Sequence, residues 1–390
     1  MADLESIYRR TLDACRPDVL VKPAVRQDMP RTVVAIGKCA GPLLDGVASV
    51  LDIESAFAVV PHGYPEPRWR GSVVVAHGAH PDMDRYSFHA GDALLRFVDE
   101  SNDVLFLISG GGSACVEAPL APFTRDELIE VNRKLVASAF PIGGINAVRK
   151  HLSAIKGGRL GARVRGTSMT LVYSDVASGA IADVASGPTV ADPTTIDDAA
   201  RILRALGLDT IAGKLREETV KHIDNGTAEV IADNTTLTTA AATFVDQPVV
   251  WPGQIEMDVV AAAEALATRA RSLHSGELLI AGGETTVVRK GAGKGGRCCE
   301  LAVRFAMLAP NAALFGSSDG VDGTSGVAAV CVAAAFRPPD ALKRAATLLQ
   351  TSDSLRASEL IGRTIIIPPT GNNLRDLFLV AADNGAMAHH

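Results

Sequence analysis

The chain has 390 residues, of which 47% are hydrophobic and 21% charged, a composition that excludes a disordered protein. At about 150 residues per domain, this length predicts two domains. Lysine and arginine total 38 against 44 aspartates and glutamates, and the net charge is −6. This acidic balance, with only 4% aromatic residues, argues against a nucleic-acid-binding surface.

The longest apolar stretches are far shorter than a membrane span. Residues 327–336 are an example, whereas a spanning helix needs ~20 apolar residues. The acidic N-terminus lacks the basic and apolar regions of a signal peptide. Six cysteines without a C-x-x-C pair favour reduced thiols. We therefore expect a cytoplasmic protein without a membrane partner.

Short β-branched runs ending in glycine or acid alternate with amphipathic segments along the chain. This alternation predicts an α/β protein whose parallel strands are covered by helices on both faces. Strands are expected at 32–36, 104–108, 169–173, 278–281, 285–289, 313–315, 330–336 and 364–367. Helices are expected at 41–50, 84–98, 125–139, 195–206, 259–273 (with Asp258 as N-cap) and 299–308.

The alternation breaks in the mixed stretch 207–257, where we place a domain boundary. The prediction is an N-terminal domain over 1–240 and a C-terminal domain over 241–385.

Two loops that follow predicted strands are candidates for binding an anion. Consecutive glycines let backbone N–H groups approach an anion, and a lysine can meet a phosphate as a point charge. The alternatives are a tight turn for the glycines and a surface position for the lysine. The residues concerned are Lys38 in one loop and Ser109, Gly110, Gly111, Gly112 and Ser113 in the other.

A third glycine-rich loop spans 291–297, after the Gly282-Gly283-Glu284 segment. Gly291, Gly293 and Gly296 fit the dinucleotide pattern G-x-G-x-x-G only weakly, because the expected first βαβ unit is missing. Phosphate handling suits the loop equally well, so Glu284, Gly295 and Gly296 are taken as binding candidates. A G-x-x-x-x-G-K-[ST] motif is absent, which excludes a P-loop NTPase.

Acidic and basic side chains add further candidates. Asp319 and Asp322 could hold a divalent cation or cap turns, and Asp175 at a strand end could be a metal ligand, a base or a cap. Five basic residues lie within 149–159, which suits an acidic substrate, although a solvated helix face is the alternative. From this segment we take Arg149, Lys150 and Lys156 as binding candidates.

Taken together, six motifs in order along the chain resemble the glycerate 2-kinases. They are Ile-Ser-Gly-Gly-Gly-Ser-Ala (108–114), Ile-Asn-Ala-Val-Arg-Lys-His-Leu-Ser (145–153), Ile-Lys-Gly-Gly-Arg-Leu (155–160), Ala-Ser-Gly-Pro-Thr-Val (185–190), Gly-Gly-Glu-Thr-Thr-Val (282–287) and Asp-Gly-Val-Asp-Gly (319–323). The resemblance implies a Rossmann-like N-terminal domain, a C-terminal MOFRL-type domain and an active site in the cleft between them.

The resemblance also implies an activity: ATP- and Mg²⁺-dependent phosphorylation of the 2-hydroxyl of D-glycerate. It assigns catalysis to Lys38 and Arg297. We add Asp175 as a further catalytic or metal-binding carboxylate, with Asp319 and Asp322 behind it as metal ligands. The expected partners are ATP and glycerate or a similar 2-hydroxy acid, and a homodimer is left open.

Some positions depart from the family pattern. Cys298 and Cys299 stand where Asn-Gln is usual, residues 174–179 lack the usual aspartate, and Ala79 replaces a glycine before His80-Pro81. A kinase of a longer sugar acid such as a tetronate is therefore an alternative. An NAD(P)-dependent hydroxypyruvate reductase and a catalytically silent sugar-acid sensor are the others.

Overall fold

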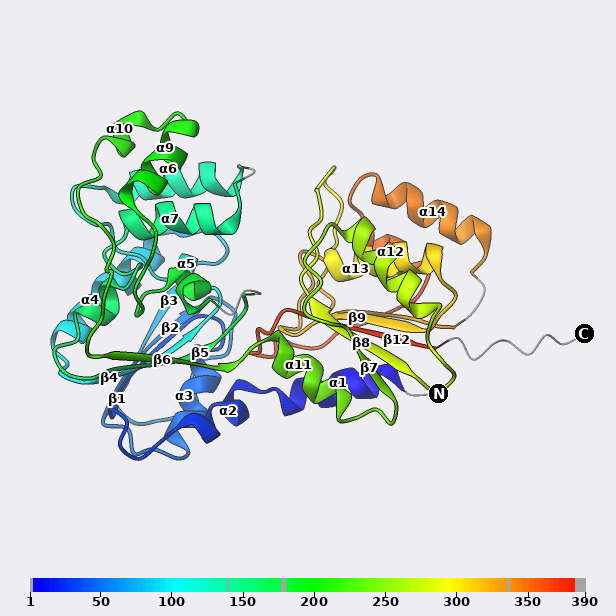
Figure 1. The fold of residues 1–390 in the computed structure, drawn as a ribbon, viewed down its shortest axis with the longest axis horizontal. Coiled ribbons are helices and arrows are strands. Elements are labelled where there is room, and N and C mark those ends of the chain that lie inside the picture. Colours follow the sequence, from blue (N-terminus) through cyan, green and yellow to red (C-terminus); the bar gives the residue numbers. More distant parts are fainter. Residues whose placement is uncertain (1–2, 139, 177–179, 335–336, 383–390) are drawn as a thin grey trace, which may run out of the picture. The chain divides into compact units, whose positions relative to one another are not determined.

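The computed structural model describes residues 3–138, 140–176, 180–334 and 337–382 and forms two compact units (Figure 1). One unit spans 17–231, and the other joins the residues up to 16 to those from 232 onward. The predicted boundary after 240 differs from this division: it falls inside α11 (Asn234–Ala242). Helix α1 (Leu4–Ala14) belongs to the C-terminal unit, where the buried Tyr8 hydroxyl donates to the Ser317 carbonyl at 2.5 Å.

The 17–231 unit is built on a six-stranded sheet of order β3-β2-β1-β4-β5-β6. The pairs β1–β2, β2–β3, β1–β4 and β4–β5 are parallel. This is the strand order of doubly wound nucleotide-binding sheets, so the predicted N-terminal fold class is confirmed. The strands are β1 (Thr32–Ile36), β2 (Ser55–Pro61), β3 (Val73–Gly78), β4 (Val104–Ser109), β5 (Ser168–Tyr173) and β6 (Gly226–Ala232).

Helices cover this sheet because its strands are apolar on both faces. Val34 and Ile36 of β1 pack in one core with Leu94 and Val98 of α4 (Arg85–Asp99). Helix α3 (Ala40–Ala48) packs against β1 and β2. A second core joins α6 (Arg125–Val136), α7 (Ile142–Leu152) and α9 (Ile196–Ala205). Short helical turns complete the unit: α2 (Pro17–Leu20), η1 (Lys22–Ala24), α5 (Gly112–Cys115), α8 (Arg159–Ala162), η2 (Ile181–Ser186) and α10 (Asp209–Ala212).

The C-terminal unit contains a mixed sheet of order β11-β10-β9-β12-β8-β7. Only β7–β8 is a parallel pair, and the other four are antiparallel, so the expectation of a parallel sheet is wrong here. Fully buried strands reveal burial on both faces and not direction, which explains the error. The strands are β7 (Pro248–Val250), β8 (Leu278–Gly283), β9 (Ala313–Ser317), β10 (Ala329–Val332), β11 (Arg363–Ile365) and β12 (Asp376–Ala381).

Helices α1 and α11 lie on one face of this sheet and α12 and α13 on the other (Figure 1). Asp258 accepts a hydrogen bond from the Val260 N–H at 2.8 Å, which confirms it as the N-cap of α12. The helices that follow α11 along the chain are α12 (Val259–Ala270), α13 (Arg297–Leu308), α14 (Pro339–Leu349) and α15 (Ser354–Glu359).

Several local predictions were wrong. Residues 285–289 form no strand, and the predicted strand at 330–336 ends at Val332, with residues 335–336 outside the described part of the chain. The sequence reading also missed β2, β3 and the central strand β12. None of the helices among the described residues is both long and apolar enough to cross a bilayer.

Candidate functional site

The carboxyl ends of β1 and β4 are the topological switch point of the 17–231 sheet. From β1 the order runs through β2 to β3 on one side and through β4 to β5 on the other. Ligands of open α/β sheets bind in the crevice at such a point. The Lys38 loop follows β1 and the glycine loop 109–113 follows β4. The fold therefore brings together two loops that the sequence singled out separately.

Hydrogen bonds hold these two loops against each other. The Lys38 N–H donates to the Gly110 carbonyl at 2.9 Å, and the Cys39 N–H donates to Ser109 Oγ at 3.1 Å. The Ser109 hydroxyl donates to the Ile36 carbonyl at 3.1 Å. Gly37 has φ +110°, and a Cβ there would lie 2.5 Å from the Ser109 carbonyl oxygen. The Ser109 hydroxyl thus holds the two loops together through hydrogen bonds, although the sequence predicts Ser109 as a ligand contact.

The glycine loop presents backbone donors. Among the described residues, none accepts a hydrogen bond from the N–H groups of Gly111, Gly112 or Ser113. Gly111 is left-handed at φ +84°, and a Cβ there would lie 3.0 Å from Lys38 Cγ. Helix α5 has only four residues, so its dipole adds little positive charge at this loop. An anion here would rely on the N–H groups and on Lys38.

Aromatic rings flank Lys38 on the same edge of the sheet. Its Nζ lies 5.5 Å from the centre of the Tyr64 ring, and Tyr64 meets His80 edge to face with ring centres 6.4 Å apart. The sequence reading missed Tyr64, because a lone tyrosine between two strands carries no motif.

Asp175 follows β5, the next strand after β4, and is half-buried. Because β4 and β5 are parallel, Asp175 follows the same edge of the sheet as the two loops. Mg²⁺ in phosphotransferases takes one or two carboxylates together with substrate phosphates, so this single acid fits the metal. The described residues contain no group of three histidines, cysteines or acids that could hold a metal by themselves. The departure at 177–179 lies outside the described residues.

The basic residues of α7 and the following turn are largely paired inside the protein. Lys150 donates to Asp192 at 2.9 Å, and the Lys156 ammonium donates to Glu117 at 2.5 Å and to the Val116 carbonyl at 3.1 Å. The two lysine side chains are 3% and 1% exposed. Arg149 is half-buried and donates to the Asn132 side-chain oxygen at 2.8 Å. Lys150 and Lys156 thus have the contacts of structural counter-ions, whereas the partner of Arg149 is a neutral amide.

In the C-terminal unit Arg297, the first residue of α13, is held by two carboxylates. Its guanidinium donates twice to Asp376, at 2.6 and 3.2 Å, and once to Glu284. Glu284 also pairs with Arg375 at 3.2 Å. Burial lowers the pKa of the guanidinium, but the two carboxylates outweigh it and raise the pKa of Arg297 well above its usual value. The arginine is therefore a fixed cation, and its side chain is still 32% exposed.

Three N–H groups of the loop 291–296 have acceptors within the chain, among them that of Gly293, which donates to the Thr351 carbonyl at 3.1 Å. The Gly295 and Gly296 N–H groups donate to the Thr324 and Ser354 hydroxyls, each at 3.2 Å. At the start of α13, Asp322 accepts from the Cys298 and Cys299 N–H groups at 3.0 and 2.8 Å. The Asp322 carboxylate thus occupies the helix end where a dinucleotide pyrophosphate would bind.

Asp319 and Asp322 both act as caps in the structure. Asp319 accepts from the Ser317 hydroxyl at 2.8 Å and from the Val321 N–H at 3.0 Å. Burial raises the pKa of Asp322, against its two backbone donors. The alternative of a turn-capping acid, which the sequence left open, describes Asp319, whereas Asp322 caps the start of α13. The role of both residues as metal ligands stays a prediction.

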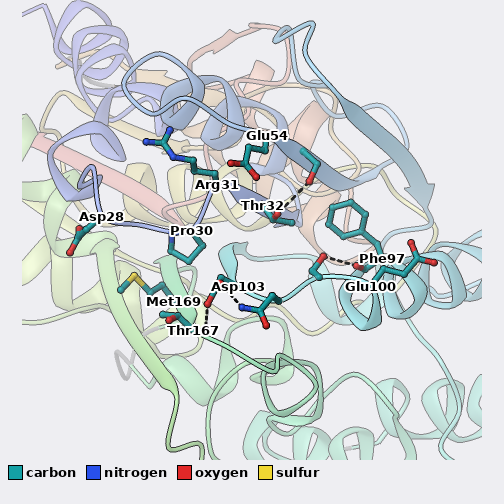
Figure 2. A pocket seen from close by; sticks show the side chains of 13 residues that line it. Asp28, Pro30, Arg31, Thr32, Glu54, Phe97, Glu100, Asp103, Thr167 and Met169 are labelled. Carbon is teal, nitrogen blue, oxygen red and sulfur yellow. Dashed lines mark hydrogen bonds between the residues drawn. The ribbon is translucent and has the colours of Figure 1, made fainter.

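Two cavities differ in their position relative to the candidate site. One of about 190 Å³ lies beside Arg297, Gly295 and Gly296 in the C-terminal unit. A larger one, of about 790 Å³, lies at the amino ends of β1, β2, β4 and β5 (Figure 2). The larger cavity is on the edge opposite the switch point, so its size does not make it the reaction site.

Comparison with known proteins decides the family. Residues 3–221 match a model described as a domain of unknown function (DUF4147), and residues 277–376 match the MOFRL family. Glycerate 2-kinase of Sulfurisphaera tokodaii is 31% identical, covering 89% of each chain. An Agrobacterium vitis protein that carries the name hydroxypyruvate reductase is 32% identical, covering 95% of this chain and 93% of that one. The crystal structure of Thermotoga maritima glycerate kinase superposes with a TM-score of 0.84 at 30% identity, covering 97% and 98% of the two chains.

The chain belongs to the MOFRL-type glycerate 2-kinase family. Its two cysteines that depart from the family pattern, Cys298 and Cys299, are completely buried in α13. Burial raises the pKa of both thiols, which keeps them neutral packing groups. These two departures therefore change the interior of this glycerate 2-kinase relative and not a surface that a substrate can reach.

The substitution Lys156→Met tests whether Lys156 is a structural counter-ion. Removing one member of a buried pair leaves Glu117 unpaired and should destabilise the protein by about 3–5 kcal/mol in urea unfolding. Lys134→Met is the matched control, because its pair with Glu130 is solvent-accessible and should cost no more than about 1 kcal/mol. A Lys156→Met protein that is as stable as the control but has lost substrate binding would restore Lys156 to the binding site.

Proposed function

We propose that this protein is an ATP-dependent kinase that phosphorylates the 2-hydroxyl of D-glycerate to give 2-phospho-D-glycerate. The observation that carries the proposal is the switch point, where Lys38 adjoins backbone N–H groups of Gly111, Gly112 and Ser113 that have no acceptor among the described residues. Relatives named glycerate 2-kinase over nearly the whole chain support the same activity.

Phosphoryl transfer depends mainly on positioning and on cations that stabilise the spread negative charge. Lys38 supplies one cation on the 17–231 unit. Arg297, fixed by Asp376 and Glu284, supplies another on the C-terminal unit. The N–H groups of the glycine loop bind an anion, either the acceptor carboxylate or a phosphate. We propose both Lys38 and Arg297 as catalytic residues.

Mg²⁺, when bound with ATP, neutralises charge on the phosphates, and Asp175 is the residue we propose to hold it. Asp175 also stands on the edge where it can accept a proton or a hydrogen bond from the acceptor hydroxyl. We further propose that the protein acts in the cytoplasm, where its six free cysteines would stay reduced.

The reductase alternative has weaker support. The only sequence pattern that suggested a dinucleotide, Gly291 to Gly296, precedes a helix end that Asp322 already caps. NADH or NADPH should therefore leave the melting temperature unchanged.

The acceptor is tested by ADP release with ATP and Mg²⁺ across D-glycerate, L-glycerate and four-carbon sugar acids. We expect the highest kcat/KM with D-glycerate and, by NMR, phosphate on its second carbon. A rate with a tetronate alone would support phosphoryl transfer but would change the proposed acceptor from D-glycerate to a four-carbon sugar acid. Hydroxypyruvate reduction with NADH, in the absence of any ADP release, would contradict the proposal.

The substitution Lys38→Ala removes a cation from the transferred group and should lower kcat about 10²–10³-fold, as loss of one preorganised donor does elsewhere. Lys38→Arg, which keeps the charge, should retain more of the rate. Lys22→Ala, an exposed lysine of the same unit, is the control and should leave kcat unchanged. A near-normal kcat for Lys38→Ala, with an unchanged melting temperature, would remove Lys38 from the mechanism.

A further inference from the structure

A chain of polar side chains runs from the glycine loop into the interior of the 17–231 unit. Ser113 Oγ lies 2.8 Å from Ser186 Oγ, and Ser186 Oγ lies 3.1 Å from Asn146 Oδ1. Asn146 Nδ2 in turn lies 3.2 Å from an oxygen of Asp183. Ser186 and Asn146 are 0% and 2% exposed, so they bond to one another and not to bulk water.

The chemistry of these groups fixes the direction of every hydrogen bond. A carboxylate only accepts, so the Asn146 amide must turn its Nδ2 toward Asp183 and its Oδ1 toward Ser186. Ser186 must then donate its single proton to that oxygen. Because Ser186 has no second proton, it can only accept from Ser113. The proton of the Ser113 hydroxyl is therefore committed to Ser186.

The far end of the chain is anchored by charge. The Lys150 ammonium lies 3.9 Å from the Asp183 carboxylate and is itself bonded to Asp192 at 2.9 Å. This ammonium places a positive charge beside the Asp183 oxygen that accepts from Asn146.

At the end of this hydrogen-bonded series that is nearest the glycine loop, the backbone conformation fixes the position of Ser186. Ala185 and Ser186 have φ of 51° and 60°, a left-handed conformation that non-glycine residues adopt only at a cost. In this conformation Ser186 reaches Ser113, and the carbonyl of Ser186 accepts from the Gly157 N–H at 3.1 Å.

We propose that Ser113 accepts a hydrogen bond from a hydroxyl of the substrate and does not donate to its carboxylate or phosphate. The N–H groups of Gly111 and Gly112 beside it supply the anion donors. One loop would then recognise an anion and a hydroxyl side by side, the pattern of a hydroxy acid. Ser186, Asn146 and Asp183 are positioning residues that set the direction of the Ser113 proton.

The substitution Ser186→Ala tests this direction without relying on turnover. It frees the Ser113 proton to point at a bound anion, so the affinity for inorganic sulfate, measured by calorimetry, should rise about threefold to tenfold. Asp183→Asn, which lets the Asn146 amide reverse, should give a gain of the same sign. The double variant Ser113→Ala/Ser186→Ala should lose the gain, and Ser101→Ala, at the opposite edge of the sheet, should bind sulfate as the unmodified protein does.

A gain in affinity is informative because mere structural damage would not produce it. Unchanged sulfate binding in both Ser186→Ala and Asp183→Asn would overturn the proposal, as would a gain that persists without Ser113.

Hydroxyl recognition, which rests on the proposed function, is measured with D-glycerate and its analogues 3-hydroxypropionate and D-lactate, each lacking one hydroxyl. The quantity compared is the binding affinity for each acid. Ser113→Ala should bind glycerate no more tightly than one of the two analogues. An unchanged ratio of affinities for both analogues would overturn this assignment. If the unmodified protein phosphorylates none of these acids, the proposed function fails while the sulfate series still decides the direction of the Ser113 proton.

Discussion

The hydrogen bond from the Lys38 N–H to the Gly110 carbonyl is the constraint on which the candidate site depends. It joins the loops after β1 and β4 at the switch point, and Ser109 reinforces the joint from inside. Gly37 is required there because any side chain would strike the Ser109 carbonyl. With the loops fixed in this way, the N–H groups of the loop 109–113 lie beside Lys38, and this is the arrangement that we propose binds a negative charge.

In the C-terminal unit, the contacts at the start of α13 fix the position of a cation, Arg297. Asp376 lies at the start of β12 and Glu284 just after β8, two adjacent antiparallel strands, and both meet Arg297 at the first turn of α13. The Asp322 carboxylate caps the same turn by accepting a hydrogen bond from the Cys298 N–H. An arginine held by two carboxylates loses little side-chain entropy when it meets a phosphate, which suits stabilisation of a transferred phosphoryl group.

The sequence predicted the features that depend on local chemistry. The glycine loop, Lys38 and the N-cap Asp258 could be found because each carries its own pattern. The buried pairing of Lys156 could not be, because its partner Glu117 lies 39 residues away and a basic run looks the same whether buried or solvated. Strand direction in the C-terminal unit, the central strand β12 and the pairing of α1 with that unit also depend on long-range packing that no local pattern records.

The most direct test of this account is a crystal structure of the protein with D-glycerate, Mg²⁺ and a non-hydrolysable ATP analogue. The account predicts a carboxylate or phosphate oxygen that accepts hydrogen bonds from the N–H groups of Gly111 and Gly112, with the Lys38 ammonium beside the same ligand. Both ligands bound with their anionic groups away from the ends of β1 and β4 would contradict it.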